Sequence, residues 1–370
     1  MNEEQVVEPI FESEHRKGWS AGRIIKLVGA FLVLAMVVGV ISLSFIKVDK
    51  VIIEPGLAET VADKIDFGGA ETFSDNGEIR FLTVLVSSRK PSYTEYLVAK
   101  YLKDDVEILP WKEVNGNLSN QESEEINNAL MVQSQNTAAF VALNAIGCEV
   151  EQKGTGAIIS AIEKKSPAFK AFEIGDVIVE INGKPISLDS QAGDEIRKNN
   201  PGDEIEVVAE RGKSRNRIAK IVKLTDSPYD NGKAFLGVGL LTRDLDINLP
   251  VDITIDPGAV SGPSAGLAFT LSIIDKLTNG SLTGGQVVSA TGEIALDGSV
   301  GPVGGVEQKA VAAKGVGTQV LIVPKGEGKQ ARKKSGSMKV FEVENIFDAI
   351  AALEKSGGDK MRQVQTCPST

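Results

Sequence analysis

The chain has 370 residues, enough for two or three domains of about 100 to 200 residues each. Hydrophobic residues make up 42% and charged residues 24%, which excludes a disordered polymer and a membrane protein with many spans. The formal net charge is -10 and no block is dense in Lys and Arg, so nucleic acid is not an expected partner.

Two residue types are scarce enough to limit the chemistry. His15 is the sole histidine, so the rest of the chain cannot form a Ser-His-Asp triad or a histidine zinc site. The two cysteines are too few for a disulfide scaffold or a cysteine zinc site. Cys148 is expected in a core, because its neighbours are apolar, and Cys367 lies in a polar stretch. We therefore expect no metal ion and no other cofactor.

Residues 27–46 carry no charge and predict a transmembrane helix. Twenty residues at 1.5 Å each give about 30 Å, the thickness of a bilayer hydrocarbon core. A cleavable signal peptide is the alternative, but the stretch is longer than a usual signal and no clear A-x-A site follows it. Four basic residues between positions 16 and 26 precede the span, against Lys47 and Lys50 after it. This bias predicts a single-pass protein with a cytoplasmic N-terminus and residues 47–370 outside the cytoplasm.

The region after the span predicts a strand over residues 79–88, then helices over 94–102 and 121–146. The expected inward residues of the longer helix are Ile126, Leu130, Val141, Ala142 and Ala145.

Residues 148–225 have a different sequence pattern from the regions before them and predict a small β-rich module. Turn signals at 175–176, 182–183 and 201–202 separate short strands with alternating apolar residues. The motifs SPA (166–168), GDVI (175–178), ING (181–183) and PGD (201–203) resemble those of a bacterial PDZ domain. PDZ domains add an extended peptide to a sheet edge, and the resemblance places the loop that binds the peptide carboxylate at Gly154, Thr155, Gly156 and Ala157. Thr155 departs from the usual apolar residue at the second position, and the loop has the alternative of serving only as a turn.

Residues 234–355 predict a mixed α/β unit. The expected strands are 235–241, 251–255, 287–293 and 319–323, and the expected helices are 263–277, 306–314 and 346–355.

A serine opens the first of these helices in the segment GPSAG (262–266). Pro263 suits a first helical position, and Ser264 shares a stripe with Leu267 and Leu271, so its hydroxyl is expected to point inward. Free amides at a helix start can stabilise an oxyanion. The alternative is a serine that only caps its own helix.

Lys309 lies on the apolar face of the next helix. It shares a stripe with Val306, Ala310 and Ala313, whereas Lys314 is rotated by about 140° and is expected in water. Burial would lower the pKa of Lys309 and let the neutral amine act as a base. A lysine that reaches out to water is the alternative.

These segments resemble the proteolytic domain of Lon-type peptidases. The matching motifs are GPSAG (262–266), TGEI (291–294) and VGGVEQK (303–309). The resemblance implies that Ser264 is the nucleophile, Lys309 the general base and Thr291 the residue that orients the amine. Together with the span and the PDZ motifs, the chain is similar to the membrane-anchored PDZ-Lon family of bacterial proteases.

Two departures from the Lon pattern follow. Many Lon enzymes have an acidic residue three positions before the serine, where this chain has Ser261, so a charged contribution to the pKa of Lys309 is not expected. The ATPase ring is also absent, and the sequence has no G-x-x-x-x-G-K-[ST] loop. The amide of Ser264 is one candidate oxyanion donor, Pro263 is excluded, and the second donor stays unnamed.

The predicted fold class is an α/β (α+β) Lon-type proteolytic domain with an inserted PDZ-like domain and an N-terminal transmembrane helix. The expected divisions are a cytoplasmic segment (1–26), the helix (27–46), the first part of the Lon-like body (51–147), the PDZ-like domain (148–225), the proteolytic domain (234–355) and a flexible tail (356–370).

The predicted function is an ATP-independent serine endopeptidase that cleaves extracytoplasmic or membrane-proximal proteins, with the PDZ module binding peptides. The expected partners are proteins or peptides, the membrane and, by resemblance, other copies in a ring of six. The alternatives are a tail-specific PDZ protease, whose serine and lysine usually lie closer together, and a non-catalytic membrane scaffold that binds exported C-termini.

Overall fold

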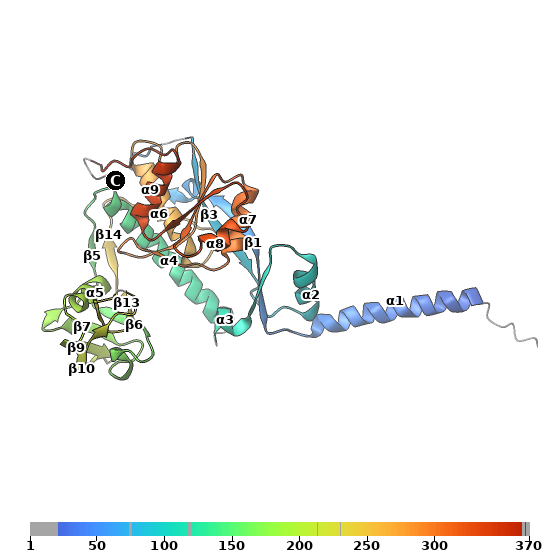
Figure 1. The fold of residues 1–370 in the computed structure, drawn as a ribbon, viewed down its shortest axis with the longest axis horizontal. Coiled ribbons are helices and arrows are strands. Elements are labelled where there is room, and N and C mark those ends of the chain that lie inside the picture. Colours follow the sequence, from blue (N-terminus) through green and yellow to red (C-terminus); the bar gives the residue numbers. More distant parts are fainter. Residues whose placement is uncertain are drawn as a thin grey trace, which may run out of the picture.

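A computed structural model describes residues 21–73, 76–116, 120–212, 214–229, 231–364 and Cys367. The predicted cytoplasmic segment 1–26, with His15, lies almost wholly outside these residues. Helix α1 (Ala21–Phe45) extends away from the rest of the chain (Figure 1). Its residues Lys26–Phe45 are long and apolar enough to cross a membrane, and none of them is buried. An N-terminal signal sequence is also an apolar segment, so this helix is a candidate membrane span.

The main body is built on one mixed sheet with the strand order β20-β19-β16-β3-β1-β4. Strands β3, β16, β19 and β20 run parallel, while β1 pairs antiparallel with both β3 and β4. The sheet therefore joins the segments before and after residues 148–225 into one folded body. The strand bounds are β1 (Lys50–Thr60), β3 (Glu78–Val86), β4 (Glu107–Pro110), β16 (Val287–Ala290), β19 (Val320–Pro324) and β20 (Lys339–Val343).

Strand β1 was not among the predicted elements, because Pro55 and Gly56 interrupt its apolar pattern. The register between β1 and β3 shifts between Pro55 and Ala58, which marks a bulge. A Cβ atom at Gly56 would lie 2.4 Å from Thr83 Oγ1, so the close approach of the two strands requires glycine there.

Helices cover both faces of this sheet, and alternate residues of each strand belong to different cores. Phe81 and Ile322 pack with α4, α6 and α9, whereas Leu82 and Leu321 pack with α7 and α8 on the other face. The helix bounds are α2 (Tyr93–Leu102), α3 (Trp111–Asn115), α4 (Asn120–Ala145), α6 (Gly266–Leu277), α7 (Val306–Gly315), α8 (Gly328–Arg332) and α9 (Ile346–Ser356).

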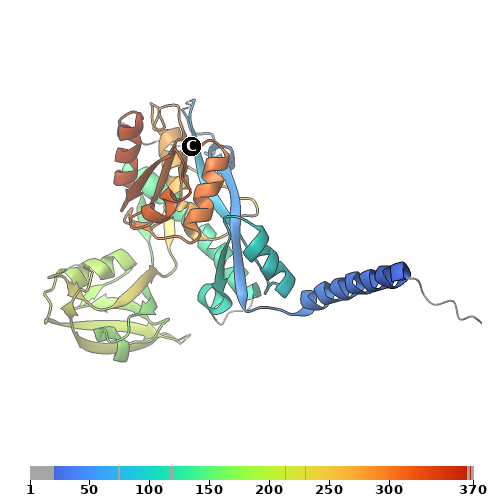
Figure 2. The same cartoon turned by 45° about the vertical axis from the view of Figure 1, so that its right-hand side comes forward.

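A second sheet, with the order β10-β9-β7-β6-β13, forms a separate lobe with its own core (Figures 1 and 2). Helix α5 (Asp189–Arg197) packs on it. The paired strands β5 and β14 connect the lobe to the body. The bounds are β5 (Glu151–Lys153), β6 (Ala157–Ile162), β7 (Val177–Ile181), β8 (Lys184–Pro185), β9 (Glu204–Arg211), β10 (Asn216–Lys223), β13 (Val238–Thr242) and β14 (Asp246–Asn248).

Short elements complete the described part of the chain. They are β2 (Ile65–Asp66), β11 (Thr225–Asp226), β12 (Ala234–Phe235), β15 (Thr254–Ile255), β17 (Glu293–Ile294), β18 (Val300–Gly301) and the 3-10 helices Ala62–Lys64, Pro167–Lys170 and Pro263–Ala265.

Two sequence-based expectations are wrong at the level of single elements. Residues 234–242, expected to open the proteolytic unit, belong to the second lobe because β13 pairs with β6. Ile126, expected to point inward, is 46% exposed, because the first half of α4 projects beyond the core and borders a cleft.

The expectation of a flexible C-terminal tail is also wrong for its described residues. The Val364 amide donates to the Ile146 carbonyl at 3.0 Å, and Met361 and Val364 pack against the core. Cys367 forms a disulfide with Cys148, 219 residues away, whereas the sequence analysis considered the two cysteines separately. Apolar residues recur at every third position from 361 to 367, and this pattern is hidden among polar neighbours.

Cys367→Ser is expected to lower the free energy of unfolding by about 2 to 4 kcal/mol, because a long loop becomes unconstrained in the unfolded chain. Denaturant unfolding of the full chain in detergent, with and without a reducing agent, measures this loss. Reduction should destabilise the wild type and leave the variant unchanged. Free thiols in the untreated wild type, or equal midpoints for the two proteins, would contradict the pairing.

Candidate active site

Ser264 lies in the 3-10 turn (Pro263–Ala265) that precedes α6, and its side chain is half-buried. Gly262 has φ of 89°, a conformation that glycine adopts without strain, and its amide donates to the Asn127 carbonyl at 3.0 Å. Gly266 leaves room for Ser134, since a Cβ atom at that position would lie 2.7 Å from the Ser134 hydroxyl. These two glycines explain why the segment GPSAG can place a serine against α4.

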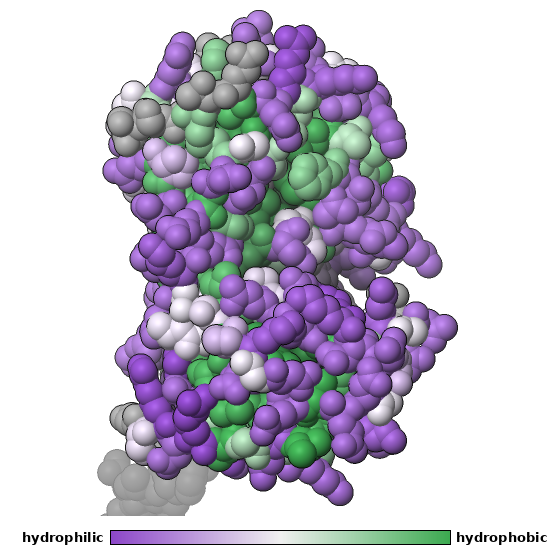
Figure 3. Space-filling model, turned by 90° about the vertical axis from the view of Figure 1, so that its left-hand side faces the viewer, coloured by the Kyte–Doolittle hydropathy of each residue, from purple (hydrophilic) through white to green (hydrophobic). Residues whose placement is uncertain are grey.

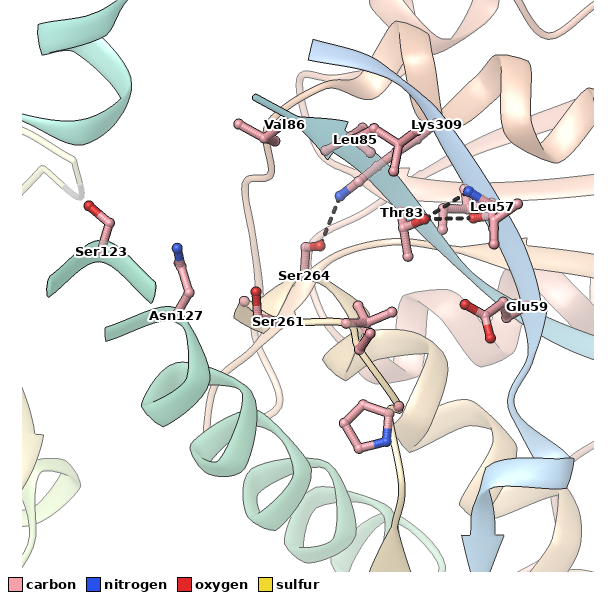
Figure 4. Close-up of a pocket in the computed structure, with 18 of the residues that line it drawn as sticks. Leu57, Glu59, Thr83, Leu85, Val86, Ser123, Asn127, Ser261, Ser264 and Lys309 are labelled. Atoms are coloured by element: carbon pink, nitrogen blue, oxygen red, sulfur yellow. Dashed lines mark hydrogen bonds between the residues drawn. The ribbon is translucent and has the colours of Figure 1, made fainter. Parts of the chain in front are cut away.

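Lys309 reaches Ser264 from α7 on the other side of the cleft. Its side chain is only 2% exposed, and Nζ lies 2.9 Å from Ser264 Oγ (Figure 4). Lys314, on the same helix, is exposed. The backbone before α7 turns at Gly305, whose φ is 66° and where a Cβ atom would lie 2.7 Å from Val84. Residues 45 positions apart in sequence thus meet in space.

Thr291 completes the contact around the amine. It follows β16, it is fully buried, and its Oγ1 accepts a hydrogen bond from Lys309 Nζ at 2.9 Å. The same hydroxyl donates to the Ser264 carbonyl at 3.2 Å. Thr291 therefore fixes the amine and the backbone of Ser264 relative to each other.

Burial lowers the pKa of Lys309 to about 8, and the charges of Glu327 and Glu293 act in the opposite direction. Burial also raises the pKa of both carboxyl groups. The sequence analysis considered only the acidic residue missing at position 261, and did not identify these two glutamates. The two glutamates come from β17 and from the residue before α8, so they are close to Lys309 only in the folded chain.

Ser264 and Lys309 line a cleft of about 820 Å³. One wall consists of β1 and residues 82–86 of β3, and the other consists of the start of α4 and residues 257–262 (Figure 4). Strand β16 pairs with β3 only over residues 78–81, so in the described chain the rest of that strand edge borders the cleft. The apolar side chains of Leu57, Leu85 and Val86 are 46 to 64% exposed there.

The sequence analysis did not identify residues 82–86 as a wall of the cleft, because nothing in the sequence of β3 shows where its pairing with β16 ends. The second oxyanion donor stays unnamed, and the Gly262 amide is not free for this role because it donates to the Asn127 carbonyl. The described residues contain no group of three or more His, Cys, Asp or Glu side chains that could hold a metal.

The predicted carboxylate loop, Gly154 to Ala157, lies in the other lobe and is not joined to the Ser264 group. Two of its amides are already used, since Thr155 donates to the Arg243 carbonyl and Gly156 donates to the Ser187 carbonyl. A groove of about 460 Å³ lies instead between α5 and the β12–β13 segment, where β13 is the edge of its sheet. Residues 295–297 of the main body also line this groove.

Comparison with known proteins gives two family matches. Residues 242–352 match the Lon protease (S16) C-terminal proteolytic domain, and residues 144–221 match the PDZ domain. The Lon protease of Metamycoplasma arthritidis is 37% identical over 90 residues, which cover 24% of this chain and 10% of that protein. The Lon protease of Phenylobacterium zucineum is 35% identical over 130 residues, which cover 34% of this chain and 16% of that protein.

This chain thus matches only about a tenth to a sixth of the length of these relatives. The PDZ domain of the SdrC-like protein from Listeria monocytogenes is 23% identical, with a TM-score of 0.21, over 23% of this chain and 87% of that one. The two family matches fall on the two lobes described above. The chain therefore combines a region similar to the Lon-type (S16) proteolytic domain with a region similar to the PDZ domain.

Proposed function

We propose that this protein is a serine endopeptidase in which Ser264 is the nucleophile and Lys309 is the general base. The observation that carries the proposal is the 2.9 Å contact between a buried amine and a hydroxyl that faces a cleft. An amine with a pKa of about 8 is substantially neutral in mildly alkaline solution and can accept the serine proton. Thr291 is proposed to orient this amine.

The reaction proceeds in two halves. Ser264 Oγ attacks the peptide carbonyl carbon while its proton moves to Lys309 Nζ, and backbone amides at the start of α6 stabilise the oxyanion. The carbon–nitrogen bond then breaks, and Lys309 gives its proton to the leaving amine. Water, deprotonated by Lys309, attacks the ester, and the serine regains its proton when the acyl group leaves.

The shape of the cleft supports an extended, partly apolar substrate. The open edge of β3 over residues 82–86 offers main-chain groups to an added strand, and Leu57, Leu85 and Val86 offer apolar contacts. We infer that the substrates are unfolded segments, loops or tails, and that cleavage occurs next to apolar residues.

We further propose that the enzyme is membrane-anchored through α1, acts outside the cytoplasm and needs no ATP. The disulfide suits an oxidising compartment, and the basic residues before the span favour a cytoplasmic N-terminus. The sequence has no phosphate-binding loop of the Walker type.

The test is cleavage of unfolded casein by the full chain in detergent, with and without ATP, with products identified by mass spectrometry. Cleavage that does not depend on ATP is expected. Absence of cleavage under both conditions would favour the non-catalytic scaffold, and cleavage only at substrate C-termini would favour a tail-specific protease.

The pH dependence should follow the lysine. Activity, measured as kcat/KM on a fluorogenic peptide, is expected to rise with pH and to reach half its maximum near pH 8, because only the neutral amine accepts the proton. Glu327→Gln should move this midpoint to lower pH, since the carboxylate charge holds the pKa of Lys309 up. Lys325→Gln, which removes an exposed charge near the same loop, is the control. An unchanged or higher midpoint in Glu327→Gln would contradict the assignment.

The PDZ groove between α5 and β13 is proposed to bind extended peptides. Gly193 lines it from the helix, where a Cβ atom would meet only the flexible end of Arg197. Gly193→Trp is therefore expected to fill the groove and weaken peptide capture at least about tenfold by fluorescence anisotropy, with cleavage of a short peptide unchanged. The control is Gln191→Trp, on the same helix but outside the groove lining. Equal capture by both variants would place the peptide elsewhere.

A further inference from the structure

Helix α2 is attached to the end of α1 by several hydrogen bonds. The Tyr93 amide donates to the Ile46 carbonyl at 2.7 Å, and the Ser44 and Thr94 hydroxyls are 3.1 Å apart. Lys47 and Ser92 form an isolated β-bridge. The first turn of α2 is therefore level with the last turn of α1, as Figure 1 also shows.

The outer face of α2 is apolar, whereas a helix face that is exposed to water is usually polar. Ala99 is buried against the body and Val98 borders a cavity on that side, whereas Tyr101 and Leu102 are 69% and 79% exposed. Three of the four tyrosines in the sequence lie on this helix. Tyrosine is enriched where a membrane meets water, because the ring is apolar and the hydroxyl is polar.

The charges around this face suit an anionic surface. The Lys100 amine lies over the rings of Tyr96 and Tyr101, at 5.6 and 5.3 Å from their centroids. Three of the acidic groups nearby have basic partners, since Lys90 pairs with Asp49, Arg89 with Glu95 and Lys103 with Glu54. Repulsion of anionic headgroups by these acids is thus reduced.

We propose that the outer face of α2, formed by Tyr101 and Leu102, lies in the headgroup region of the bilayer that α1 crosses. This inference rests on the proposed role of α1 as a membrane anchor. If residues 26–45 span about 30 Å of hydrocarbon, the bilayer surface passes near Ile46. The fixed contact of Tyr93 with Ile46 then places α2 at that surface.

The side of the molecule opposite α1 has a different distribution of hydrophobic residues from the outer face of α2. On the face turned away from α1, hydrophobic residues are interspersed among hydrophilic ones over both lobes (Figure 3). Position relative to α1, together with the aromatic composition, favours lipid over a second copy of the chain as the partner of α2.

This placement has a consequence for substrates. A cavity of about 550 Å³ lies between α2 and the end of β3, and Leu85 and Val86 line both this cavity and the catalytic cleft. The cleft therefore continues toward the membrane side of the body. Extended segments that leave the bilayer next to the anchor are the substrates best placed to enter it.

Depth-dependent fluorescence quenching tests the proposal. The full chain carrying Trp19→Phe and Trp111→Phe is given one new tryptophan, Tyr101→Trp, and is reconstituted in vesicles of phosphatidylcholine and phosphatidylglycerol. Lipids brominated in the upper acyl chain should reduce its emission by roughly half, since bromine quenches only indoles within contact. The control, Tyr229→Trp, replaces a tyrosine of the PDZ lobe that is 80% exposed and should not be quenched.

Equal quenching of the two reporters, or none at Tyr101→Trp, would overturn the proposal. Emission that changes with protein concentration in detergent but not with brominated lipid would also overturn it, because a second copy would then cover the face.

A cleavage assay tests the consequence for substrates. In the native-tryptophan chain, the pair Tyr101→Ser and Leu102→Ser should slow cleavage of a membrane-tethered reporter severalfold and leave soluble casein cleavage unchanged. Equal rates on the tethered reporter would contradict membrane-directed access. Failure of the wild type to cleave casein would instead count against the proposed function and leave the quenching result standing.

Discussion

Ser264→Ala is expected to lower kcat/KM on unfolded casein by roughly 10³-fold or more, because it removes the atom that forms the acyl-enzyme. The fold should be kept, since the side chain is half-buried and, in the described structure, its hydroxyl is hydrogen-bonded to Lys309. Peptide cleavage followed by mass spectrometry, with thermal unfolding in parallel, measures both properties.

Ser261→Ala is the matched control for this substitution. Ser261 lines the same cleft three residues earlier but has no hydrogen bond to Lys309 in the described structure, so nearly normal activity is expected (Figure 4). Loss of activity in Ser261→Ala together with full activity in Ser264→Ala would show that the nucleophile has been assigned to the wrong serine.

Lys309→Arg is expected to be as inactive as Lys309→Ala, with a loss of about 10² to 10⁴-fold in kcat/KM. A guanidinium stays protonated at every pH at which the protein is folded, so it cannot take the serine proton. Lys314→Arg, on the exposed side of the same helix, is the control and should be fully active. Substantial activity in Lys309→Arg at neutral pH would contradict the role of the amine as a base.

Stability separates the chemical role of Lys309 from a structural one. Burial lowers its pKa from 10.5 to about 8 in the folded chain, so the unfolded chain binds more protons between these values and stability should rise with pH over that window. Lys309→Met removes the buried charge and should raise the free energy of unfolding at pH 7 by about 1 to 3 kcal/mol, while activity is lost. A variant that is both inactive and strongly destabilised would show that the lysine supports the fold instead.

Local patterns in the sequence were sufficient to locate most helices and several strands. The 3.6-residue periodicity of residues 306–314 correctly predicts that Lys309 points inward and Lys314 outward, because both are set by one helix face. The turn residues of the PDZ lobe are equally local, and the family matches confirm both domain types.

Contacts between distant segments could not be predicted in the same way. The pairing of Cys148 with Cys367, the carboxylates near Lys309 and the occupied amides at Thr155 and Gly156 all depend on which segments pack together. Ile126 shows the same limit, since its periodic position indicates a buried residue but no neighbouring element covers it.

The sequence by itself determined the two kinds of domain, the candidate span and which serine, lysine and threonine are the candidates for the site, because each depends on residues close together along the chain. Only the tertiary structure decided that the amine and the hydroxyl meet, where the cleft opens and that α2 begins level with the end of α1. The physical reason is that hydrogen bonds, burial and charge interactions act over a few ångströms in space, whatever the separation in sequence.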